Sequence, residues 1–242
     1  MKNKPSTFSV ITATLDSERF IGRLLRSLED QTDDDFSFVV FDGGSTDKTE
    51  EVIRSSNLKN VTILKGRDSG IYDALNRCIA EVQTDYYIVC GADDQLSHNA
   101  LKHYKSSADI SGADIICSKV KIGESIVVPR KKMAWLYGMG GLSSSHSVGV
   151  AIRTGLHEKY GLYSKKLPIA ADQLFIKRVH ADGGVFHYAD FVSGEFALSG
   201  TSGTDTAGVL TESFRVQLAT EKHKFLQLLI FLARIVKNYN KL

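Results

Sequence analysis

The stretch FSFVVFDGG at residues 36–44 decides the fold of this chain of 242 residues. Its first six residues have the length and the apolar composition of a buried strand, and Asp42-Gly43-Gly44 is a turn signal. Three more runs of strand length lie around it: Phe8–Ala13, Val61–Leu64 and Tyr86–Cys90. Helices are expected in the intervals between these strands. Apolar residues at helical spacing predict helices over Ser17–Gln31 and Ile71–Val82, and a possible capping box that begins at Asp47 predicts a helix that extends to about Ser55. This β-α-β-α order predicts an α/β fold, with a mostly parallel central sheet and helices on both faces.

The second half of the chain is less regular than the first. Glycine- and serine-rich stretches predict loops there, and apolar stretches predict strands and helices. In chain order these are strands at Asp114–Val120 and Ser125–Val128, loops over Lys131–Ser147, an apolar run at Val148–Ile152, a helix over Ala171–Ala181, a mobile loop over Gly194–Gly208 and helical structure from Leu210 onward. Because no linker divides the chain, we expect one domain over residues 1–205 and a C-terminal helical extension over residues 206–242.

Composition and charge exclude several classes of protein. The chain is 43% hydrophobic and 24% charged, which suits a packed core and argues against disordered, fibrous and repeat architectures. Its net charge is +2 with mixed signs, so nucleic acid is not an expected partner. The cysteines, Cys78, Cys90 and Cys117, fit neither a disulfide framework nor a zinc site. The N-terminus lacks the apolar core of a secretion signal, so a reducing, cytoplasmic setting is expected.

Carboxylates follow two of the expected strands. Asp42 ends the second strand, and Asp93 and Asp94 follow the fourth, so the ends of parallel strands bring them to one edge of the sheet. Neighbouring buried acids repel each other unless a cation or hydrogen-bond donors compensate. Oxygen ligands and phosphates suit Mg²⁺ or Mn²⁺, and Gly43 and Gly91 permit the close approach of a ligand. The pattern favours a metal–phosphate site, and the alternative is that these acids are turn and cap residues.

Four stretches of the first half, in their order and spacing, resemble the N-terminal part of the family 2 inverting glycosyltransferases, which have the GT-A fold. They are VITAT at residues 10–14, DGGSTDKT at 42–49, DSGIYDALN at 68–76 and GADD at 91–94. A weaker similarity runs from His146 to Arg178, where IAADQLF at 169–175 resembles the acidic motif before a helix in this family. The resemblance fades after Phe191 and is nearest to bacterial enzymes that build capsule, exopolysaccharide and O-antigen units.

The resemblance implies that a nucleotide-diphosphate sugar binds at this edge. By this resemblance, Asp42 hydrogen-bonds the base of the nucleotide, which is typically uracil. Guanine also offers ring N–H donors, so a GDP-sugar is the alternative donor. Asp93 contacts the ribose or the donor sugar, and Asp94 binds the Mn²⁺ or Mg²⁺ that bridges the diphosphate. The remaining residues on the donor side are Thr12, Ala13, Thr14, Gly43, Arg67 and Asp68.

The resemblance also implies that Asp172 is the general base. A sugar hydroxyl is a poor nucleophile and needs a carboxylate within hydrogen-bond reach. The metal stabilises the charge of the leaving nucleoside diphosphate, and direct attack from the opposite face inverts the anomeric centre. The alternative role for Asp172, which follows two alanines at the start of a helix, is a helix N-cap.

Two positions depart from the family's pattern. Many members carry arginine where this chain has Leu75, so a basic contact to the donor is missing or is supplied by Arg67 or Arg77. The family's metal motif often opens with an aspartate, where this chain has Gly91. With one ligand fewer, Asp94 is the main protein ligand, and metal affinity without the nucleotide is expected to be weak.

Candidate residues for the acceptor side lie in the irregular second half. His146 occupies a place where relatives often have a histidine that faces the site, and an ordinary loop or capping role is the alternative. Trp135 and Tyr137 either stack on an acceptor sugar or pack in the core. The basic triplet at residues 130–132 suits a phosphate or a lipid headgroup, and its alternative is a solvated turn.

These observations predict a metal-dependent inverting glycosyltransferase that moves a sugar to a saccharide or lipid-linked saccharide in cell-surface polysaccharide synthesis. A sugar nucleotidyltransferase or a dehydrogenase is a competing class. However, the loop Thr12–Asp16 lacks the glycine, arginine and lysine of the former, and no dinucleotide fingerprint or P-loop occurs. A non-catalytic module that binds carbohydrate or nucleotide sugar on the same fold is the other alternative.

The C-terminal run FLQLLIFLARIV at residues 225–236 is apolar apart from Gln227 and Arg234, and lysines flank it. At helical rise it is about 18 Å long, short of the ~30 Å hydrocarbon core, so a membrane span is not expected. Three interpretations remain: a helix in the membrane interface, a subunit contact in a homodimer, or burial on the catalytic domain. The basic flanks favour peripheral, salt-sensitive association with the inner face of the cytoplasmic membrane. Phe225, Leu229 and Leu232 are expected among the inserted or packed residues.

Overall fold

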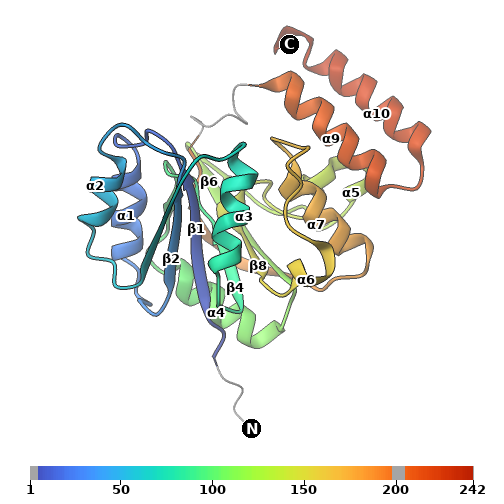
Figure 1. Cartoon of the computed structure of the whole chain (residues 1–242). Helices are drawn as coiled ribbons and strands as arrows, with labels where there is room; N and C mark the ends of the chain where they lie inside the picture. The colour runs from blue at the N-terminus through green and yellow to red at the C-terminus, as the bar shows by residue number, and fades with distance from the viewer. Residues whose placement is uncertain (1–4, 198–204, 242) are drawn as a thin grey trace.

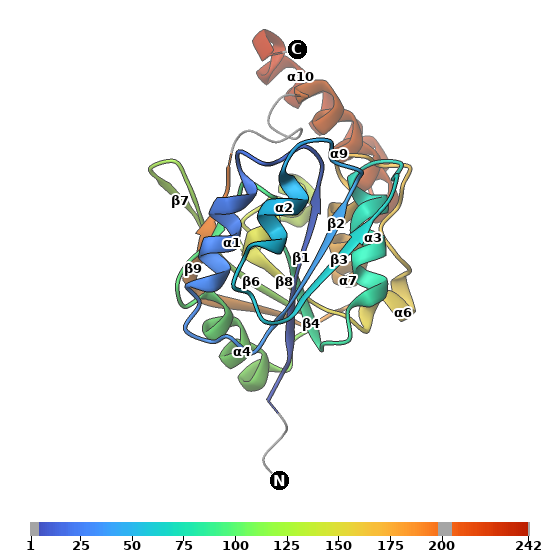
Figure 2. The same cartoon turned by 60° about the vertical axis from the view of Figure 1, so that its left-hand side comes forward.

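A computed structural model describes residues 5–197 and 205–241 of the chain (Figure 1). One sheet forms the centre, and helices cover both of its faces (Figure 2). The strands are β1 (Phe8–Thr14), β2 (Ser37–Asp42), β3 (Val61–Lys65), β4 (Tyr86–Val89), β5 (Gln95–Leu96), β6 (Ile115–Ile122), β7 (Ser125–Val127), β8 (Val150–Arg153) and β9 (Phe186–Glu195). The α-helices are α1 (Ile21–Glu29), α2 (Thr49–Arg54), α3 (Ile71–Glu81), α4 (Ala100–Ser111), α5 (Ala134–Tyr137), α6 (Leu156–Tyr160), α7 (Ala171–Ala181), α9 (Thr206–Thr220) and α10 (Lys224–Lys237).

The sheet has the order β3-β2-β1-β4-β8-β6-β9-β5, with β7 paired to β6. Strands β3, β2, β1 and β4 are parallel neighbours, whereas β8 runs antiparallel to both β4 and β6. Strands β6 and β9 are again parallel. The predicted α/β fold with a mostly parallel sheet is therefore confirmed. The carboxyl ends of β1, β2 and β4 lie at one edge of the sheet, where ligands of open α/β sheets bind.

Packing on both faces explains why β2 is apolar along its whole length. Phe38 and Val40 belong to the core layer that includes α1 and α4, while Val39 and Phe41 belong to the layer that includes α3 and α7. Successive residues of a strand point to opposite faces, so a strand covered on both sides is apolar throughout.

The first half follows the predicted order of elements, with one local correction at α2. The predicted capping box of Asp47 and Glu50 does not form. The Asp47 carboxylate accepts hydrogen bonds from the backbone N–H and the hydroxyl of Thr49. The Glu50 carboxylate instead pairs with Lys65 on β3 and with Arg54. The lysine on the neighbouring strand therefore holds this glutamate away from the helix N-terminus.

The second half departs further from the sequence-based expectation. The loops predicted over Lys131–Ser147 contain α5 and a 3₁₀ turn at Gly138–Gly141. Helix α4 and strand β9 have no counterpart in the expectation, because their inward positions are held largely by small, polar or half-buried residues that give a weak apolar pattern. The loop predicted over Gly194–Gly208 overlaps the ends of β9 and α9, and residues 198–204 lie outside the described residues.

The C-terminal helices α9 and α10 form a hairpin that packs on α7 and α5 (Figure 1). Within the hairpin, Phe214 stacks on Phe231 with 4.3 Å between the ring centroids. Among the helices of the described ranges, none has the length and apolar character needed to cross a bilayer.

Candidate functional site at the carboxyl edge of the sheet

Asp42 ends β2 with its carboxylate fixed in the interior. Its Oδ1 accepts hydrogen bonds from the backbone N–H groups of Gly44 (3.1 Å) and Ser45 (2.8 Å) and from the Ser45 hydroxyl (2.6 Å). Its Oδ2 is buried and has no hydrogen-bond partner among the described residues. Buried acceptors are rarely left unpaired, so this oxygen suits an N–H donor supplied by a ligand.

The end of β1 lies beside Asp42 and presents a second unpaired polar atom. The Thr12 hydroxyl donates to the carbonyl of Cys90 on the other flank of β1 (2.9 Å). Ala13 is half-buried, and the Thr14 hydroxyl is buried without a hydrogen-bond partner in the described part of the chain. Two neighbouring strand ends, β1 and β2, therefore each carry a buried polar atom that has no hydrogen-bond partner among the described residues.

Gly43 allows the loop after β3 to approach this pair of strands. Its N–H donates to the Thr14 carbonyl (2.9 Å), and a Cβ at this position would lie 2.8 Å from Oδ2 of Asp68. Only a glycine therefore fits between Thr14 and Asp68 without a shift. Asp68 is exposed, and its Oδ1 accepts the Gly70 N–H at the start of α3 (2.8 Å).

The structure explains the absence of arginine at position 75. Leu75 is buried in the core layer that α3 forms with the sheet, where an arginine side chain would lose its hydration. The Arg77 guanidinium lies over the Phe41 ring and donates to the Arg67 carbonyl (3.0 Å). The exposed side chain of Arg67 is thus the arginine of this loop that can reach a donor.

Asp94 follows β4 and is almost fully buried, with 1% of its surface exposed. Its Oδ2 accepts the Gly91 N–H (2.8 Å) and its Oδ1 accepts the Ala197 N–H (3.1 Å). Burial raises the pKa of this carboxyl to about 7. A Cβ at position 91 would lie 2.9 Å from Oδ1 of Asp93 and 3.2 Å from Oδ2 of Asp94, which explains why glycine stands where the family often has aspartate.

The two adjacent carboxylates have oxygen chemistry that fits Mn²⁺ or Mg²⁺ together with phosphate oxygens. Each oxygen of Asp94 accepts a single N–H and retains a lone pair. In the described ranges, no group of three or more His, Cys, Asp or Glu side chains is arranged to hold a metal. The weak metal affinity expected in the absence of the nucleotide stays a prediction.

His146 lies at the same end of the sheet as Asp94. Its ring contacts the ring of Phe196 at 4.1 Å between centroids, and the next residue, Ala197, donates its N–H to Asp94. His146 is half-buried, and burial lowers its pKa. The structure thus places His146 over the Asp94 end of the edge.

Trp135 and Tyr137 lie on α5, under the C-terminal hairpin rather than in the core. Each side chain is 42% exposed, so the alternative of core packing is wrong for both. The guanidinium of Arg130 lies over the Tyr137 ring at 4.4 Å. The Trp135 carbonyl accepts hydrogen bonds from side chains of α9 and α10.

Asp172 lies in the first turn of α7 and reaches the edge through Tyr72 of α3. The Tyr72 hydroxyl is 2.7 Å from Oδ1 of Asp172 and 2.9 Å from the Ile169 carbonyl. The Gln173 N–H also donates to Oδ1 (2.8 Å), whereas Oδ2 has no hydrogen-bond partner among the described residues. Burial raises the pKa of Asp172 and the hydrogen bonds oppose that rise. The N-cap position of α7 is Ala170, so the alternative of Asp172 as an N-cap is wrong.

Glu212 of α9 is a contributor to this site that sequence reasoning missed. Its Oε2 accepts the N–H groups of Ile169 and Ala170, both at 2.9 Å, and so caps α7 from another helix. Glu212 is 7% exposed, and its charge raises the pKa of Asp172. Tyr72 was also missed as a site residue, although it lies within the DSGIYDALN motif. The signal for Glu212 is a lone acid among apolar residues of a helix.

The buried Lys177 ties the same hairpin to α7. Its ammonium contacts the side chains of Gln217 and Glu221, and its exposed fraction is 2%. The C-terminal helices are therefore joined to the helix of the candidate base by two sets of buried polar contacts.

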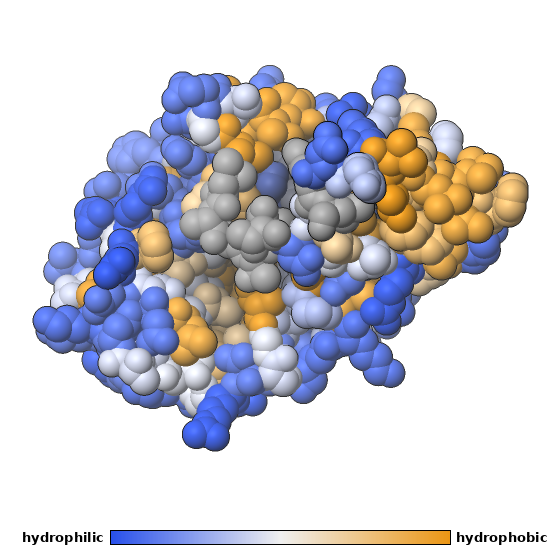
Figure 3. Space-filling model, turned by 90° about the horizontal axis from the view of Figure 1, so that it is seen from above, coloured by the Kyte–Doolittle hydropathy of each residue, from blue (hydrophilic) through white to orange (hydrophobic). Residues whose placement is uncertain are grey.

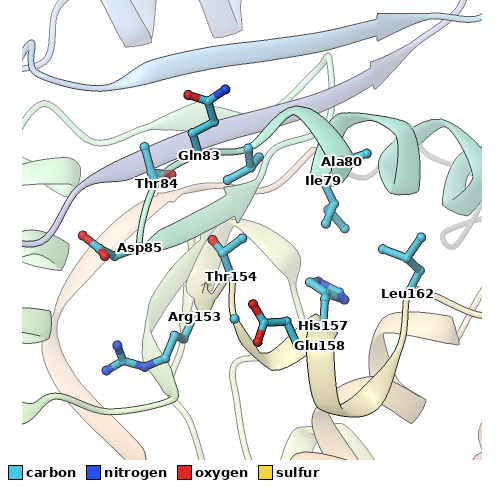
Figure 4. A pocket seen from close by; sticks show the side chains of 12 residues that line it. Ile79, Ala80, Gln83, Thr84, Asp85, Arg153, Thr154, His157, Glu158 and Leu162 are labelled. Carbon is cyan, nitrogen blue, oxygen red and sulfur yellow. The ribbon is translucent and has the colours of Figure 1, made fainter.

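A pocket of about 600 Å³ lies at the opposite end of the sheet (Figure 4). It is lined by residues at the start of β4 and the end of α3, such as Asp85 and Ile79, and by His157 and Thr154 beyond β8. The His157 Nε2 is 2.7 Å from the Tyr87 hydroxyl, so its ring belongs to a buried network. None of the carboxylates of the candidate site lines this pocket.

The fold, with Asp42 and Asp94 at the carboxyl ends of β2 and β4, defines an α/β protein with a candidate site at one edge of its sheet. The family described as Glycosyl transferase family 2 matches residues 9–154. The chain therefore belongs to glycosyl transferase family 2, as its sequence motifs predict.

Curated relatives share parts of this chain. The PGL/p-HBAD biosynthesis glycosyltransferase of Mycobacterium bovis is 38% identical over 92 residues, a match that covers 37% of this chain and 36% of that relative. The poly(ribitol-phosphate) beta-N-acetylglucosaminyltransferase TarS of Staphylococcus aureus is 27% identical over 185 residues, 72% of this chain and 32% of TarS. These matches thus span about a third of each relative's length.

Solved structures share the fold. TarS 1–349 of S. aureus in complex with UDP-GlcNAc has a TM-score of 0.72 at 20% identity and covers 97% of this chain and 73% of that chain. The mannosyltransferase PcManGT from Pyrobaculum calidifontis, in complex with GDP-Man and Mn²⁺, has a TM-score of 0.67 at 16% identity and covers 99% of this chain and 76% of that chain.

Proposed function

We propose that this chain is an inverting glycosyltransferase that moves a sugar from a nucleotide-diphosphate sugar to a saccharide or lipid-linked saccharide of the cell surface. The observation that carries this proposal is the gathering of three carboxylates at one edge of the sheet. Asp42 and Asp94 come from the ends of β2 and β4, and the Tyr72 hydroxyl brings Asp172 to the same edge from the second half of the chain. The names of the relatives support the same class of reaction.

The donor is a UDP-sugar in this proposal. The unpaired Oδ2 of Asp42 accepts the ring N–H of uracil, with the Thr14 hydroxyl beside it. Gly43, Asp68 and Arg67 line the opening on the β3 side, and Asp93 contacts the ribose or the donor sugar. The S. aureus TarS structure with UDP-GlcNAc supports uridine, whereas the PcManGT structure contains GDP-Man. Titration of UDP and GDP decides between them, and tighter binding of GDP would refute the assignment to uridine.

Asp94, with Asp93 beside it, is the place for Mn²⁺ or Mg²⁺ in this mechanism. The structures of PcManGT and of the Mycobacterium tuberculosis glucosyl-3-phosphoglycerate synthase contain Mn²⁺, which supports metal dependence. A bound ion of this kind supplies Lewis-acid stabilisation to the diphosphate. The Gly91 and Ala197 N–H groups orient the Asp94 carboxylate toward that position.

Asp172 removes the proton of the attacking hydroxyl. Tyr72 and the Gln173 N–H hold Oδ1, so Oδ2 is the oxygen available to the acceptor. The acceptor oxygen forms a bond to the anomeric carbon as the bond from that carbon to the diphosphate oxygen breaks. The proton passes to Oδ2, and attack opposite the leaving group inverts the centre.

A donor-turnover assay with UDP-sugars and Mn²⁺ tests this proposal. Asp172→Asn keeps the shape of the side chain and removes the base, so we expect turnover to fall by 10²-fold or more (about 10²–10⁴ for a general base) while UDP still binds. Asp182→Asn, which changes the exposed acid at the other end of α7, is the matched control. UDP binding without turnover in the unchanged protein would favour the non-catalytic module. Formation of a nucleotide sugar from a nucleoside triphosphate would favour the nucleotidyltransferase.

We further propose that the outer face of α10 contacts an anionic membrane surface. Two polar residues of this helix face the catalytic domain: Gln227, which is 2% exposed and donates to the Trp135 carbonyl at 2.9 Å, and the half-buried Arg234. Phe225, Leu229 and Leu232 are 73%, 48% and 48% exposed, so burial of this apolar face on the catalytic domain is wrong. Figure 3 shows the hydrophobic surface of this region on one side of the molecule.

Charge favours a membrane over a second copy of the chain at this face. Lys222, Lys224 and Lys237 flank the apolar residues at both ends, so in a symmetric dimer across this face the lysines of one copy would lie near lysines of the other. Anionic lipid headgroups complement them instead.

Flotation with anionic vesicles tests the membrane contact. We expect binding at low salt that Leu229→Ser combined with Leu232→Ser abolishes. Ile110→Ser, at an exposed apolar residue of α4, is the control. No flotation of the unchanged chain would refute the membrane contact, and a dimer that these substitutions dissociate would assign the face to a subunit contact.

A further inference from the structure

A second pocket, of about 300 Å³, lies between the C-terminal hairpin and the start of α7. Its walls include Tyr137 of the α5 turn, Ser213 of α9, and Arg234, Lys237 and Asn238 at the end of α10. Gln173 also lines it, and this residue directly follows the candidate base. The pocket therefore begins one residue beyond Asp172, on the side of the hairpin.

The charge of this pocket is of one sign. Arg234 and Lys237 are cations, and none of the residues that line the pocket is an acid. The neighbouring acids of α9 are used elsewhere: Glu212 caps α7, and Glu221 pairs with Lys177. The hairpin thus presents positive charge to a space that adjoins the candidate base.

Arg234 is half-buried, and among the described residues its guanidinium donates a hydrogen bond only to the Leu136 carbonyl. Among the described residues, no carboxylate lies within ion-pair distance of its guanidinium, and burial lowers its pKa. A guanidinium carries five N–H donors, so most of its donors have no protein acceptor in that part of the chain. A partly desolvated cation without a counter-charge is costly, and an anionic ligand would offset that cost.

We propose that this pocket binds a phosphate group carried by the acceptor. The inference rests on the proposed function, since it assigns the acceptor side of the same site. Phosphate matches the forked donors of an arginine, and Lys237 adds a second positive charge at the mouth of the pocket. The donor diphosphate has its own place at Asp94, at the end of β4, so this pocket is a second phosphate site. The phosphate belongs either to the acceptor chain itself or to a lipid headgroup that carries the acceptor.

Binding of glycerol 3-phosphate to the full chain tests the proposal. Trp135 is the single tryptophan of the chain and lies on α5 beside the pocket, so its fluorescence reports binding alongside calorimetry. The titration is made with saturating UDP and Mn²⁺, so that the donor site is filled, and uncharged glycerol is the comparison ligand. UDP binding is measured separately, so loss of the donor site and loss of this pocket are distinguishable.

Two variants and one control test which cations of the pocket contribute to glycerol 3-phosphate affinity. Arg234→Gln should weaken glycerol 3-phosphate binding by about tenfold or more, as expected for loss of a charge-assisted hydrogen bond. Lys237→Gln should weaken it several-fold, and this exposed residue has no hydrogen bond or ion pair within the described ranges that its loss would disturb. Arg215→Gln is the matched control, because Arg215 is an exposed arginine of the same hairpin that also donates to one backbone carbonyl, that of Lys166. It should leave the affinity unchanged.

Vesicles distinguish the two sources of phosphate. Binding of glycerol 3-phosphate that depends on Arg234 and Lys237 supports a phosphate in the acceptor chain. Binding only to phosphatidylglycerol vesicles, and not to phosphatidylcholine vesicles, supports a lipid headgroup if Arg234→Gln weakens it, because the half-buried Arg234 lines the pocket and is not part of the exposed apolar face of α10. The proposal is refuted if neither probe binds, or if Arg215→Gln weakens binding as much as Arg234→Gln does.

Discussion

Removal of the charge of Glu212 should shift the pH dependence of the reaction without a change in any residue that touches substrate. Glu212 caps α7 from α9 and lies close enough for its charge to raise the pKa of Asp172. The other titratable groups that act on Asp172 are the hydroxyls of Tyr72, Tyr163 and Tyr87, all neutral near pH 7. Glu212 is therefore the charged residue to change.

The sign of the effect follows from the charge. Asp172 must be ionised to act as a base, so kcat/KM rises with pH through its pKa. Glu212→Gln removes a negative charge that opposes this ionisation, and the rising limb should move to lower pH. The amide oxygen of glutamine still accepts the N–H groups of Ile169 and Ala170, so α7 keeps its cap.

Glu212→Ala removes the cap as well as the charge. The two backbone N–H groups, each held at 2.9 Å, lose their acceptor in a buried place. We expect the free energy of unfolding to fall by about 1–3 kcal/mol. Because Asp172 lies in the first turn of the same helix, its displacement should also lower kcat, by up to about a hundredfold for a shift near 1 Å.

The assay is a set of kcat/KM profiles between pH 4 and 9 with denaturant unfolding of each variant. Glu51→Gln, at an exposed glutamate of α2, is the control and should match the unchanged protein in both measurements. A rising limb for Glu212→Gln that stays in place or moves to higher pH would refute the electrostatic role. Equal kcat for Glu212→Ala and Glu212→Gln would refute the positioning role.

Three further outcomes are expected. Tyr72→Phe removes a hydrogen bond that lowers the pKa of Asp172, so the rising limb should move to higher pH, opposite to Glu212→Gln; an unmoved limb would contradict the geometry. Gly43→Ala places a Cβ 2.8 Å from the Asp68 carboxylate, a flexible and exposed group, so stability should change by less than about 1 kcal/mol while calorimetry shows weaker UDP binding. Asp94→Asn keeps an acceptor for the Gly91 N–H but should abolish transfer and the enhancement of UDP binding by Mn²⁺; full activity in this variant, or in excess chelator, would exclude the metal-dependent mechanism.

The first half of the fold is predictable from the sequence because β1, β2 and β4 are covered on both faces. Burial on two sides forces continuous apolar runs, such as Phe36–Phe41, and the intervening helices bury one clear stripe. Strand β9 and helix α4 were not predicted, because they lack this pattern of burial. β9 has few fully buried residues, and α4 buries small residues such as Ala100 and Ala108, so neither gives a strong apolar period.

The candidate site is predictable to the extent that local motifs supply it. Asp42 and Asp94 are placed by strand ends that the sequence reveals. Glu212, in contrast, is 40 residues from Asp172 in sequence, and only the packing of α9 on α7 brings its charge to the base. No local pattern in the sequence specifies that packing.

The orientation of α10 follows from the shortness of α5. A helix of four residues cannot satisfy its own carbonyls, and buried carbonyls need donors. The Trp135 carbonyl accepts from Gln217 and Gln227, and the Leu136 carbonyl accepts from Arg234. Gln227 and Arg234 therefore attach α10, and its leucines remain exposed. At these positions of α10 the buried contact is polar and the free surface is apolar, which is the reverse of the usual amphipathic pattern.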